Sequence, residues 1–415
     1  MSENNTQDQI CVVIGASHGG VNFAFSLRKE GWEGNIILID KDPLVPYHRP
    51  PLSKAYLTTE GGMESNLLKS VESYSKENIE IMLGVSVEKI DRENQNLILA
   101  DGENLAYDKL VIATGARPFI PPIKGIDRAK NIFPLRTGAD VENIRAAFTE
   151  ATRKNVVIIG GGYIGLETAA SLRKLGGNII VLERENRVLA RVTAPEMSEY
   201  FTELHAVNGV SVLTEKDVVS IKNNQNANEV ICADGTMYEA DLIIVGVGIR
   251  VNLELAKTAG LTIDNGILVD ETAKTNDANI FAIGDCTYHF NPHYNRKIRL
   301  ESVQNAVDQA KVAAAAIVGK DPVYDTIPWF WSDQYDVKLQ MVGLSQGYTE
   351  VLVRKEDEQK FSIWYFKEDE LLAVDAVNSP KAFVVGTKFI KDSKKIDKSK
   401  LIDLEVVFKP ANLLK

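Results

Sequence analysis

Two stretches of the chain carry the same succession of apolar runs, glycine-rich turns and amphipathic segments. Residues 12–40 read VVIGASHGGVNFAFSLRKEGWEGNIILID, and residues 157–183 read VIIGGGYIGLETAASLRKLGGNIIVLE. In each, a short apolar run precedes the turn, a segment of helical periodicity follows, and a second apolar run ends in a carboxylate. This order of strand, turn, helix and strand predicts a dinucleotide-binding unit, present twice.

The repetition continues downstream of both stretches. Ala100-Asp101-Gly102 precedes LVIATGARP at residues 110–118, and Ala233-Asp234-Gly235 precedes LIIVGVGIRV at residues 242–251. We therefore expect an α/β protein with two homologous Rossmann-like, doubly wound domains.

The glycines of the second copy have separate physical roles. Gly160 permits a tight turn, Gly162 lets the backbone approach a pyrophosphate, and Gly165 lets the helix pack close to the strand. The first copy reads GASHGG at residues 15–20, with Ser17 at the middle position. We expect it still to bind phosphate, with a slightly looser approach, and His18 to be a loop residue beside the pyrophosphate.

Composition and charge narrow the range of possible functions. At roughly 150 residues per domain, 415 residues predict about three domains. Lys and Arg number 47 and Asp and Glu 57, and the net charge of −10 disfavours binding to nucleic acid or anionic lipid. The N-terminal residues lack the features of a secretory signal, and the apolar runs at 242–247 and 312–318 are shorter than a membrane span, so a cytoplasmic location is expected.

The three cysteines, Cys11, Cys232 and Cys286, are far apart and form no Cys-x-x-Cys motif. A disulfide framework and a zinc site are both disfavoured, and no metal is expected. The cysteines are interpreted as small core residues.

Two acidic residues suggest which nucleotide each unit binds. The strand-like run NIFAIGDC at residues 279–286 ends in Gly284-Asp285, where a carboxylate can accept hydrogen bonds from a polyhydroxyl chain such as the ribitol of FAD. Glu183 ends the second apolar run of the second copy, 23 residues beyond Gly160, where an acid hydrogen-bonds the adenosine ribose of NAD. This favours NADH over NADPH, although Arg184 leaves dual use open because it could receive a 2′-phosphate.

Longer motifs carry a family resemblance. They are RPPLSKAYL at residues 49–57, ATG at 113–115, GGGYIGLE at 160–167, RVLARVTAPE at 187–196, IFAIGD at 280–285, RLESVQNAVDQAK at 299–311 and PWFWSDQYDVKLQMVGLS at 328–345. With them the chain resembles, over nearly its whole length, the putidaredoxin-reductase type of FAD-dependent ferredoxin reductase. These enzymes are flavoproteins of the pyridine nucleotide-disulfide oxidoreductase-like superfamily.

The resemblance implies a domain order and an activity. An FAD domain is expected at residues 1–117 and 251–326, an inserted NAD domain at 118–250, and an α+β C-terminal interface domain at 327–415. The implied activity is that of an NADH-dependent ferredoxin reductase, which passes a hydride from NADH to FAD and then single electrons to a 2Fe-2S ferredoxin. That ferredoxin would supply a haem-thiolate monooxygenase or a ring-hydroxylating dioxygenase. The protein is expected to be a monomer or weak dimer.

The resemblance also implies the site residues. Lys54 and Glu167 are expected as a catalytic ion pair beside the flavin, with Glu167 in the first turn of its helix. A helix is expected at residues 301–311, with its N-terminus facing the flavin ring. The residues expected to bind FAD are Gly15, Ser17, His18, Gly19, Gly20, Asp40, Lys41, Arg49, Lys54, Val87, Ala113, Thr114, Gly115, Arg136, Asp285, Val303 and Trp331. Those expected to bind NAD are Gly160, Gly162, Tyr163, Ile164, Gly165, Glu183, Arg184, Arg191, Gly246 and Gly248.

The electron route leaves alternatives open. Residues 43–57 contain no cysteine, which excludes a thiol relay of the kind disulfide reductases use. Trp329 and Trp331 are candidates for the exit surface or for core aromatics. Basic candidates for ferredoxin docking, or for an ordinary solvated face, are Arg296, Lys297, Lys311, Lys320 and the lysine-rich residues 381–400. The other functions considered are a redox-responsive, NADH-binding flavoprotein like apoptosis-inducing factor, and a rubredoxin reductase.

Overall fold

The computed structural model describes residues 7–59, 61–224 and 227–415, and these divide into two units. The first unit comprises Met1–His48, Gly62–Arg117 and Arg250–Pro328. The second comprises Arg49–Gly61, Pro118–Ile249 and Trp329–Lys415. It therefore holds the segments predicted as the NAD and C-terminal domains except for residues 250 and 327–328, together with the RPPLSKAYL motif. The predicted three-domain boundaries stay a prediction.

The first unit is built on a five-stranded sheet in the order β19-β7-β1-β2-β3, with all strands parallel. Its strands and helices are β1 (Ile10–Ile14), α1 (His18–Lys29), β2 (Asn35–Asp40), α3 (Val71–Lys76), β3 (Ile79–Leu83), β4 (Val87–Asp91), β5 (Asn96–Leu99), β6 (Asn104–Ala106), β7 (Lys109–Ile112), α7 (Glu254–Thr258), β18 (Ile267–Val269), β19 (Ile280–Ala282), β20 (Thr287–Asn291), β21 (Arg296–Ile298) and α8 (Val303–Ile317). Strands β4 to β6 and β18, β20 and β21 form two smaller sheets.

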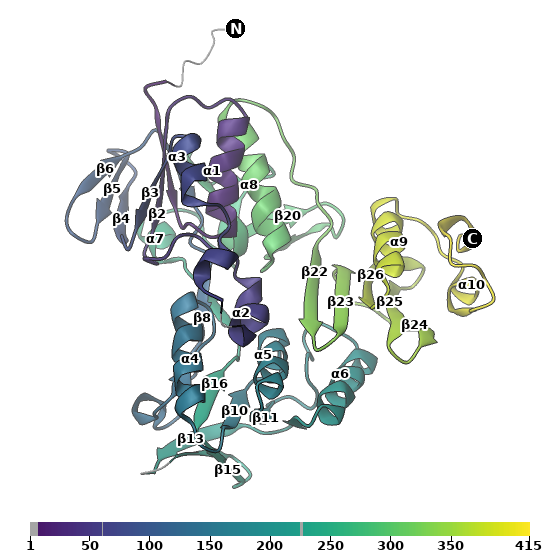
Figure 1. Cartoon of the computed structure of the whole chain (residues 1–415). Helices are drawn as coiled ribbons and strands as arrows, with labels where there is room; N and C mark the ends of the chain where they lie inside the picture. Colours follow the sequence, from purple (N-terminus) through teal and green to yellow (C-terminus); the bar gives the residue numbers. More distant parts are fainter. Residues whose placement is uncertain (1–6, 60, 225–226) are drawn as a thin grey trace. The chain divides into compact units, whose positions relative to one another are not determined.

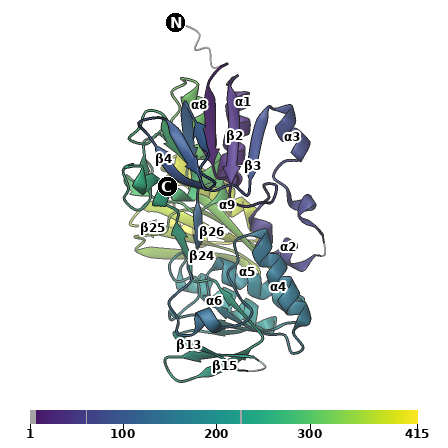
Figure 2. The ribbon, with the colours of Figure 1, turned by 90° about the vertical axis from the view of Figure 1, so that its left-hand side faces the viewer.

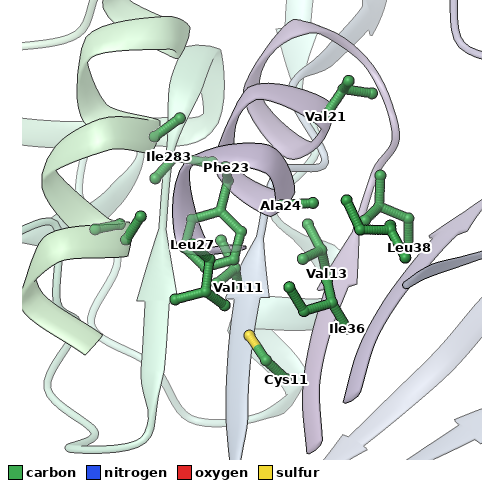
Figure 3. Close-up of a cluster of buried hydrophobic side chains, with 14 of the residues drawn as sticks. Cys11, Val13, Val21, Phe23, Ala24, Leu27, Ile36, Leu38, Val111 and Ile283 are labelled. Carbon is green, nitrogen blue, oxygen red and sulfur yellow. The ribbon is translucent and has the colours of Figure 1, made fainter. Parts of the chain in front are cut away.

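Helices α1 and α8 pack side by side on one face of this sheet (Figure 1). Phe23 and Leu27 of α1 lie over Val111 of β7 in the core (Figure 3). The alanines Ala313 and Ala314 of α8 are fully buried in the same cluster and allow close helix packing. Because both faces of a parallel sheet are covered, its strands read as nearly continuous apolar runs.

Helix α8 differs from its predicted bounds. It begins at Val303, because the Ser302 side chain caps it by accepting a hydrogen bond from the Asn305 amide at 3.1 Å. It continues to Ile317 through an alanine-rich segment of high helix propensity, and Gly319 follows with a φ of +84°. The expectation of residues 301–311 was therefore wrong at both ends.

The second unit contains a sheet of the same design and a separate antiparallel sheet. The parallel sheet has the order β12-β11-β10-β16-β9. The antiparallel sheet has the order β22-β23-β26-β25-β24. The elements are α2 (Ala55–Thr58), β9 (Ile132–Phe133), α4 (Gly138–Glu150), β10 (Asn155–Ile159), α5 (Tyr163–Lys174), β11 (Asn178–Leu182), α6 (Pro195–Val207), β12 (Ser211–Leu213), β13 (Val218–Asn223), β14 (Asn228–Cys232), β15 (Met237–Ala240), β16 (Leu242–Val245), β22 (Trp329–Gln334), β23 (Val337–Gly343), β24 (Glu350–Asp357), β25 (Lys360–Lys367), β26 (Glu370–Val377), α9 (Pro380–Lys391) and α10 (Lys398–Ile402).

Short strands β8 (Ala116–Pro118) and β17 (Ile249–Val251) lie where the chain passes between the units. Within the second unit, α9 packs on β26 and β23, and the antiparallel strands β13 to β15 lie at one end in both views (Figure 1, Figure 2). Two parallel sheets, which share the order of four of their five strands, and an α+β C-terminal part confirm the predicted fold class. None of the helices among the described residues combines the length and apolar character that a bilayer crossing needs.

Candidate nucleotide-binding and redox site

The turn between β1 and α1 and the first turn of α1 are each packed too tightly for a side chain at one glycine. Gly15 has a φ of +107°, and a Cβ there would lie 2.3 Å from the carbonyl oxygen of Ala113. A Cβ on Gly20 would lie 1.9 Å from the carbonyl oxygen of Gly15. His18 is the first residue of helix α1 and is buried, so the prediction that it is a loop residue was wrong. Because the helix begins directly after the turn, the amide groups of its first turn are placed for an anion. The turn therefore fits the pyrophosphate of a dinucleotide.

The glycine turn of the second copy is packed in the same way, except that the position of Gly162 is open. A Cβ on Gly160, which has a φ of +109°, would lie 2.5 Å from the Gly246 oxygen, and a Cβ on Gly165 would lie 2.1 Å from the Gly160 oxygen. Gly162 has an ordinary φ of −81°, and its Cβ would meet nothing within 4 Å. Neither backbone strain nor crowding within the protein accounts for glycine there, which fits the close approach of a bound pyrophosphate.

The acidic residues that end β2 and follow β11 make the same contact in both copies. Asp40 accepts a hydrogen bond from the Ala16 amide at 2.6 Å, and Glu183 accepts one from the Gly161 amide at 2.6 Å. Each carboxylate is thereby fixed beside its glycine turn, where an acid binds ribose hydroxyls. Arg184 is exposed and its guanidinium is paired with Glu185 at 3.0 Å, which weakens the case for a 2′-phosphate site.

Other residues predicted to bind FAD gather at the carboxyl edge of the first sheet. Strands β1, β7 and β19 run parallel and end there, so the turns that follow them meet at one edge. Ala113, Thr114 and Gly115 follow β7, and Asp285 lies in the short 3-10 turn after β19. Val303 opens α8, whose Ala306 Cβ would lie 3.5 Å from a Cβ on Gly284.

Two residues that were not predicted as site residues support this edge. Gln309 of α8 accepts a hydrogen bond from the Gly284 amide at 2.8 Å and holds the turn that carries Asp285. Asn252 exchanges two hydrogen bonds with Thr114, at 2.8 and 3.0 Å. Of the remaining predicted FAD residues, Lys41 is exposed next to Asp40 and Val87 begins β4 in a smaller sheet.

Four of the predicted FAD residues, Arg49, Lys54, Arg136 and Trp331, belong to the second unit. The structure brings two of them together, because the Arg49 guanidinium donates to the carbonyl oxygen of Arg136 at 2.6 Å. Trp331 is half-buried and its ring centroid lies 5.5 Å from that of Trp329. Both indoles line an open groove of about 520 Å³ with Asp333, Lys338, Gln340, Asn378 and Pro380.

Lys54 and Glu167 form the central ion pair of the second unit. Their side chains meet at 2.6 Å between Nζ and Oε2, and Glu167 is only 2% exposed. Ser53 also donates to Oε2, at 2.5 Å, and Ser332 donates to Oε1 at 2.7 Å. Both serines lie within motifs of the family resemblance, at 49–57 and 328–345, but sequence reasoning gave neither of them a role.

The position of Glu167 in its helix differs from the prediction. Helix α5 begins at Tyr163, so Glu167 is its fifth residue and lies in the second turn. The difference arises because the helix already opens at the tyrosine of the motif. At the start of α5, the Tyr163 hydroxyl donates to the Met341 sulfur at 2.9 Å, and Ile164 is 44% exposed.

The RVLARVTAPE segment is anchored to the antiparallel sheet by a buried polar cluster. Thr193 and Tyr365 both donate to the Asp375 carboxylate, at 2.6 and 2.5 Å, and the Ala194 amide donates to the Tyr365 hydroxyl at 3.0 Å. Arg191, a predicted NAD ligand, precedes this anchor, and its guanidinium lies 3.9 Å from a Cβ built on Gly248. The cluster therefore fixes the backbone that carries Arg191.

Burial raises the pKa of Asp375 to about 6, although the two hydroxyls that donate to it act in the opposite direction. Between about pH 4 and pH 6, the folded protein holds a proton that the unfolded chain has already released, so stability falls as the pH rises through this window. Asp375→Asn removes this titration. We expect the melting temperature of the variant, relative to the parent, to rise from pH 4 to pH 6 and then level off. The corresponding change in the free energy of unfolding is roughly 3 kcal/mol at most. Thermal melts across pH 4–8 measure it; a constant difference would contradict the assignment.

The described residues hold no group of three or more His, Cys, Asp or Glu side chains that could bind a metal ion. All three cysteines are buried, and burial raises the pKa of each thiol. None of them can serve as a reactive thiolate at neutral pH.

Comparison with known families agrees with this geometry. Residues 10–310 match the family model described as pyridine nucleotide-disulphide oxidoreductase, and residues 329–411 match the one described as reductase C-terminal. The chain belongs to the pyridine nucleotide-disulphide oxidoreductase family. The family resemblance predicted from the sequence motifs is therefore confirmed.

Individual relatives of this oxidoreductase are similar over nearly their full length. Putidaredoxin reductase of Pseudomonas putida is 43% identical over 411 residues, 98% of this chain and 97% of that protein. The ferredoxin–NAD(+) reductase component of the anthranilate 1,2-dioxygenase system of Burkholderia cepacia is 36% identical over 402 residues, 96% of this chain and 98% of that protein. In a solved covalent complex of putidaredoxin reductase with putidaredoxin, the matched chain gives a TM-score of 0.92 at 42% identity and 96% coverage of both chains.

Proposed function

We propose that this oxidoreductase is an NADH-dependent ferredoxin reductase that binds FAD, oxidises NADH and delivers single electrons to a 2Fe-2S ferredoxin. The observation that carries the proposal is the doubled cradle: two parallel sheets in one chain, each with a carboxylate fixed beside its glycine turn. All three cysteines are buried and protonated, so electrons would leave the flavin without a thiol relay. The relatives named above, a ferredoxin reductase of a dioxygenase system among them, support the same function.

The residues present fit both cofactors. The Gly15 to Gly20 turn with Asp40 would hold FAD, and the Gly160 to Gly165 turn with Glu183 would hold NADH. Bound FAD supplies the ability to accept a hydride and to give up its two electrons singly. Lys54 would then place a positive charge for the flavin ring, and Glu167 would fix that ammonium group in position. The positions of the bound groups decide the rate of a hydride transfer, and no proton-shuttling residue is needed.

The lysines of α9 and the segment after it are the stronger docking candidates for an acidic ferredoxin. Lys388, Lys391, Lys394 and Lys395 are exposed. By contrast, Lys311 is paired with Asp308 and Lys320 with Glu30, which reduces their attraction for a partner. We place the protein in the cytoplasm, since its cysteines are free thiols, as is usual in a reducing compartment.

The test is turnover with defined partners. An absorption spectrum is recorded before and after NADH, and cytochrome c reduction is then followed with and without a 2Fe-2S ferredoxin, with rubredoxin as a separate arm. Fast reduction that requires the ferredoxin supports the proposal. A slow, long-lived charge-transfer complex with NADH-dependent dimerisation would favour the redox-responsive flavoprotein, and turnover only with rubredoxin would reassign the partner.

Glu183→Ala tests the choice of nicotinamide cofactor. A 2′-phosphate about 4 Å from this carboxylate would be repelled by roughly 4 kcal/mol at an effective dielectric of 20, before screening by solvent. We expect the ratio of NADPH to NADH use, measured as kcat/KM, to rise by about tenfold. Arg184→Ala is the matched control on the adjacent residue and should not raise the ratio. A Glu183→Ala ratio equal to that of the parent would remove Glu183 as the discriminator.

A further inference from the structure

A line of buried polar side chains runs from Glu167 to the end of helix α6. Ser332 donates to Glu167 Oε1 at 2.7 Å, and Gln334 Nε2 donates to Ser332 Oγ at 3.2 Å. Gln334 Oε1 lies 2.8 Å from His205 Nε2, and the Tyr335 hydroxyl lies 3.1 Å from His205 Nδ1. All of these residues belong to the second unit.

This hydrogen-bond chain has one consistent direction. A carboxylate only accepts, so the Ser332 hydroxyl donates to it and accepts from the Gln334 amide group. The amide oxygen of Gln334 must then accept from His205, which places the imidazole proton on Nε2. Nδ1 is left to accept from the Tyr335 hydroxyl, so every donor points toward Glu167.

The hydrogen-bonded side chains from Glu167 to His205 are unusually well buried for polar groups. Ser332 and His205 are 0% exposed, Gln334 is 1% exposed and Glu167 is 2% exposed. Burial lowers the pKa of His205, which keeps the ring neutral, as the direction of the chain requires. Buried polar groups cost free energy to desolvate, and an apolar set of similar volume would stabilise the fold at least as well. The chain is therefore better explained by what it holds in place than by stability.

The side chains of this hydrogen-bonded line come from strand β22 and helix α6, for a geometric reason. Ser332 and Gln334 are two residues apart on β22, so their side chains share one face of the strand. His205 lies in the last turns of α6 and is held by Tyr335, whose backbone has a φ of +56°, a strained value for a bulky residue. Two elements distant in sequence thus join in one line of hydrogen bonds that ends on Oε1 of Glu167.

We infer that Ser332, Gln334 and His205 are positioning residues for the Lys54–Glu167 pair. They hold Oε1 of Glu167, so that Oε2 stays directed at the Lys54 ammonium group and Ser53. The inference rests on the proposed role of Lys54 and Glu167 in NADH-dependent flavin reduction. It adds that the C-terminal sheet sets the geometry of this pair, so its residues control the rate of flavin reduction and not the affinity for NADH.

Ser332→Ala tests the inference in the full-length, FAD-loaded protein. Loss of one orienting hydrogen bond should slow flavin reduction at saturating NADH by about three- to tenfold. The apparent Kd for NADH and the FAD content should stay at the parent values. The matched control is Ser362→Ala, which removes a buried hydroxyl from β25 of the same sheet, where Ser362 accepts from the Trp364 indole at 2.9 Å. It should lower the melting temperature comparably and leave the reduction rate unchanged.

A double-mutant cycle separates the positioning role from the function itself. In a Glu167→Gln background, Ser332→Ala should add no further loss of rate, because the group it positions has changed. Equal reduction rates for Ser332→Ala and Ser362→Ala, with a slow Glu167→Gln, would overturn the inference and leave the proposed function intact. A Glu167→Gln protein as fast as the parent would instead refute the proposed role of Glu167. Should Ser332→Ala lose its FAD, Gln334→Met breaks the chain one bond further away and gives the same comparison.

Discussion

Gly20→Ala should yield a protein that leaves purification without the yellow colour of bound flavin. The added methyl carbon would lie 1.9 Å from the carbonyl oxygen of Gly15, far inside van der Waals contact. Gly15 cannot retreat, because its own Cα is packed against the carbonyl group of Ala113. The start of α1 must therefore shift away from the turn. A displacement of about 1 Å at such a site costs on the order of a hundredfold in function.

The measurement is the ratio of FAD to protein, from the visible absorbance and from flavin released by denaturation. Circular dichroism checks that the fold is retained. Gly19→Ala is the sharpest comparison, because it adds the same methyl group one residue earlier on the same helix. Its nearest neighbours there, the side chains of Ile283 and Ala306, lie at 3.5 and 3.8 Å, which is ordinary contact. We expect Gly19→Ala to keep most of its FAD. A yellow Gly20→Ala protein would show that the turn does not hold the flavin.

The sequence predicted the parts of the molecule that depend on local pattern. The two glycine turns are specified by residues that are adjacent in the chain, and so are the acids that end β2 and follow β11. The internal duplication made the prediction stronger, since both copies had to satisfy the same backbone constraints. The pairing of Lys54 with Glu167 came from the family resemblance, and the structure places the two side chains in contact.

The rest could not be predicted because it depends on contacts between distant segments. Ser332 reaches Glu167 across 165 positions of sequence, and His205 reaches Gln334 across 129. Serine, glutamine and histidine have no periodicity that marks such a contact. Asp375 likewise gives no signal within the run from Leu371 to Val377, which is otherwise apolar, although its burial against Thr193 fixes a loop of the predicted NAD site. Packing, and not pattern, decides which polar residues are buried together.

Lys54→Ala should have the largest effect on the rate of flavin reduction. The lysine is the cation that compensates the Glu167 carboxylate, which is 2% exposed and, within the described part of the chain, accepts otherwise from the hydroxyls of Ser53 and Ser332. Removing one partner of a buried ion pair costs about 3–5 kcal/mol of stability. Removing the positive charge that the proposed mechanism places at the flavin should also slow its reduction by NADH at least tenfold, or about 1.4 kcal/mol.

The double variant Lys54→Met/Glu167→Gln distinguishes these two effects. It removes the uncompensated charge as well as the cation, so its melting temperature should recover toward that of the parent protein. Its reduction rate, measured by stopped flow at saturating NADH, should stay as low as that of Lys54→Ala, because the ammonium group is still absent. Recovery of both stability and rate would mean that Lys54 serves the fold alone. An unchanged rate in Lys54→Ala itself, with full FAD occupancy, would remove the lysine from the mechanism.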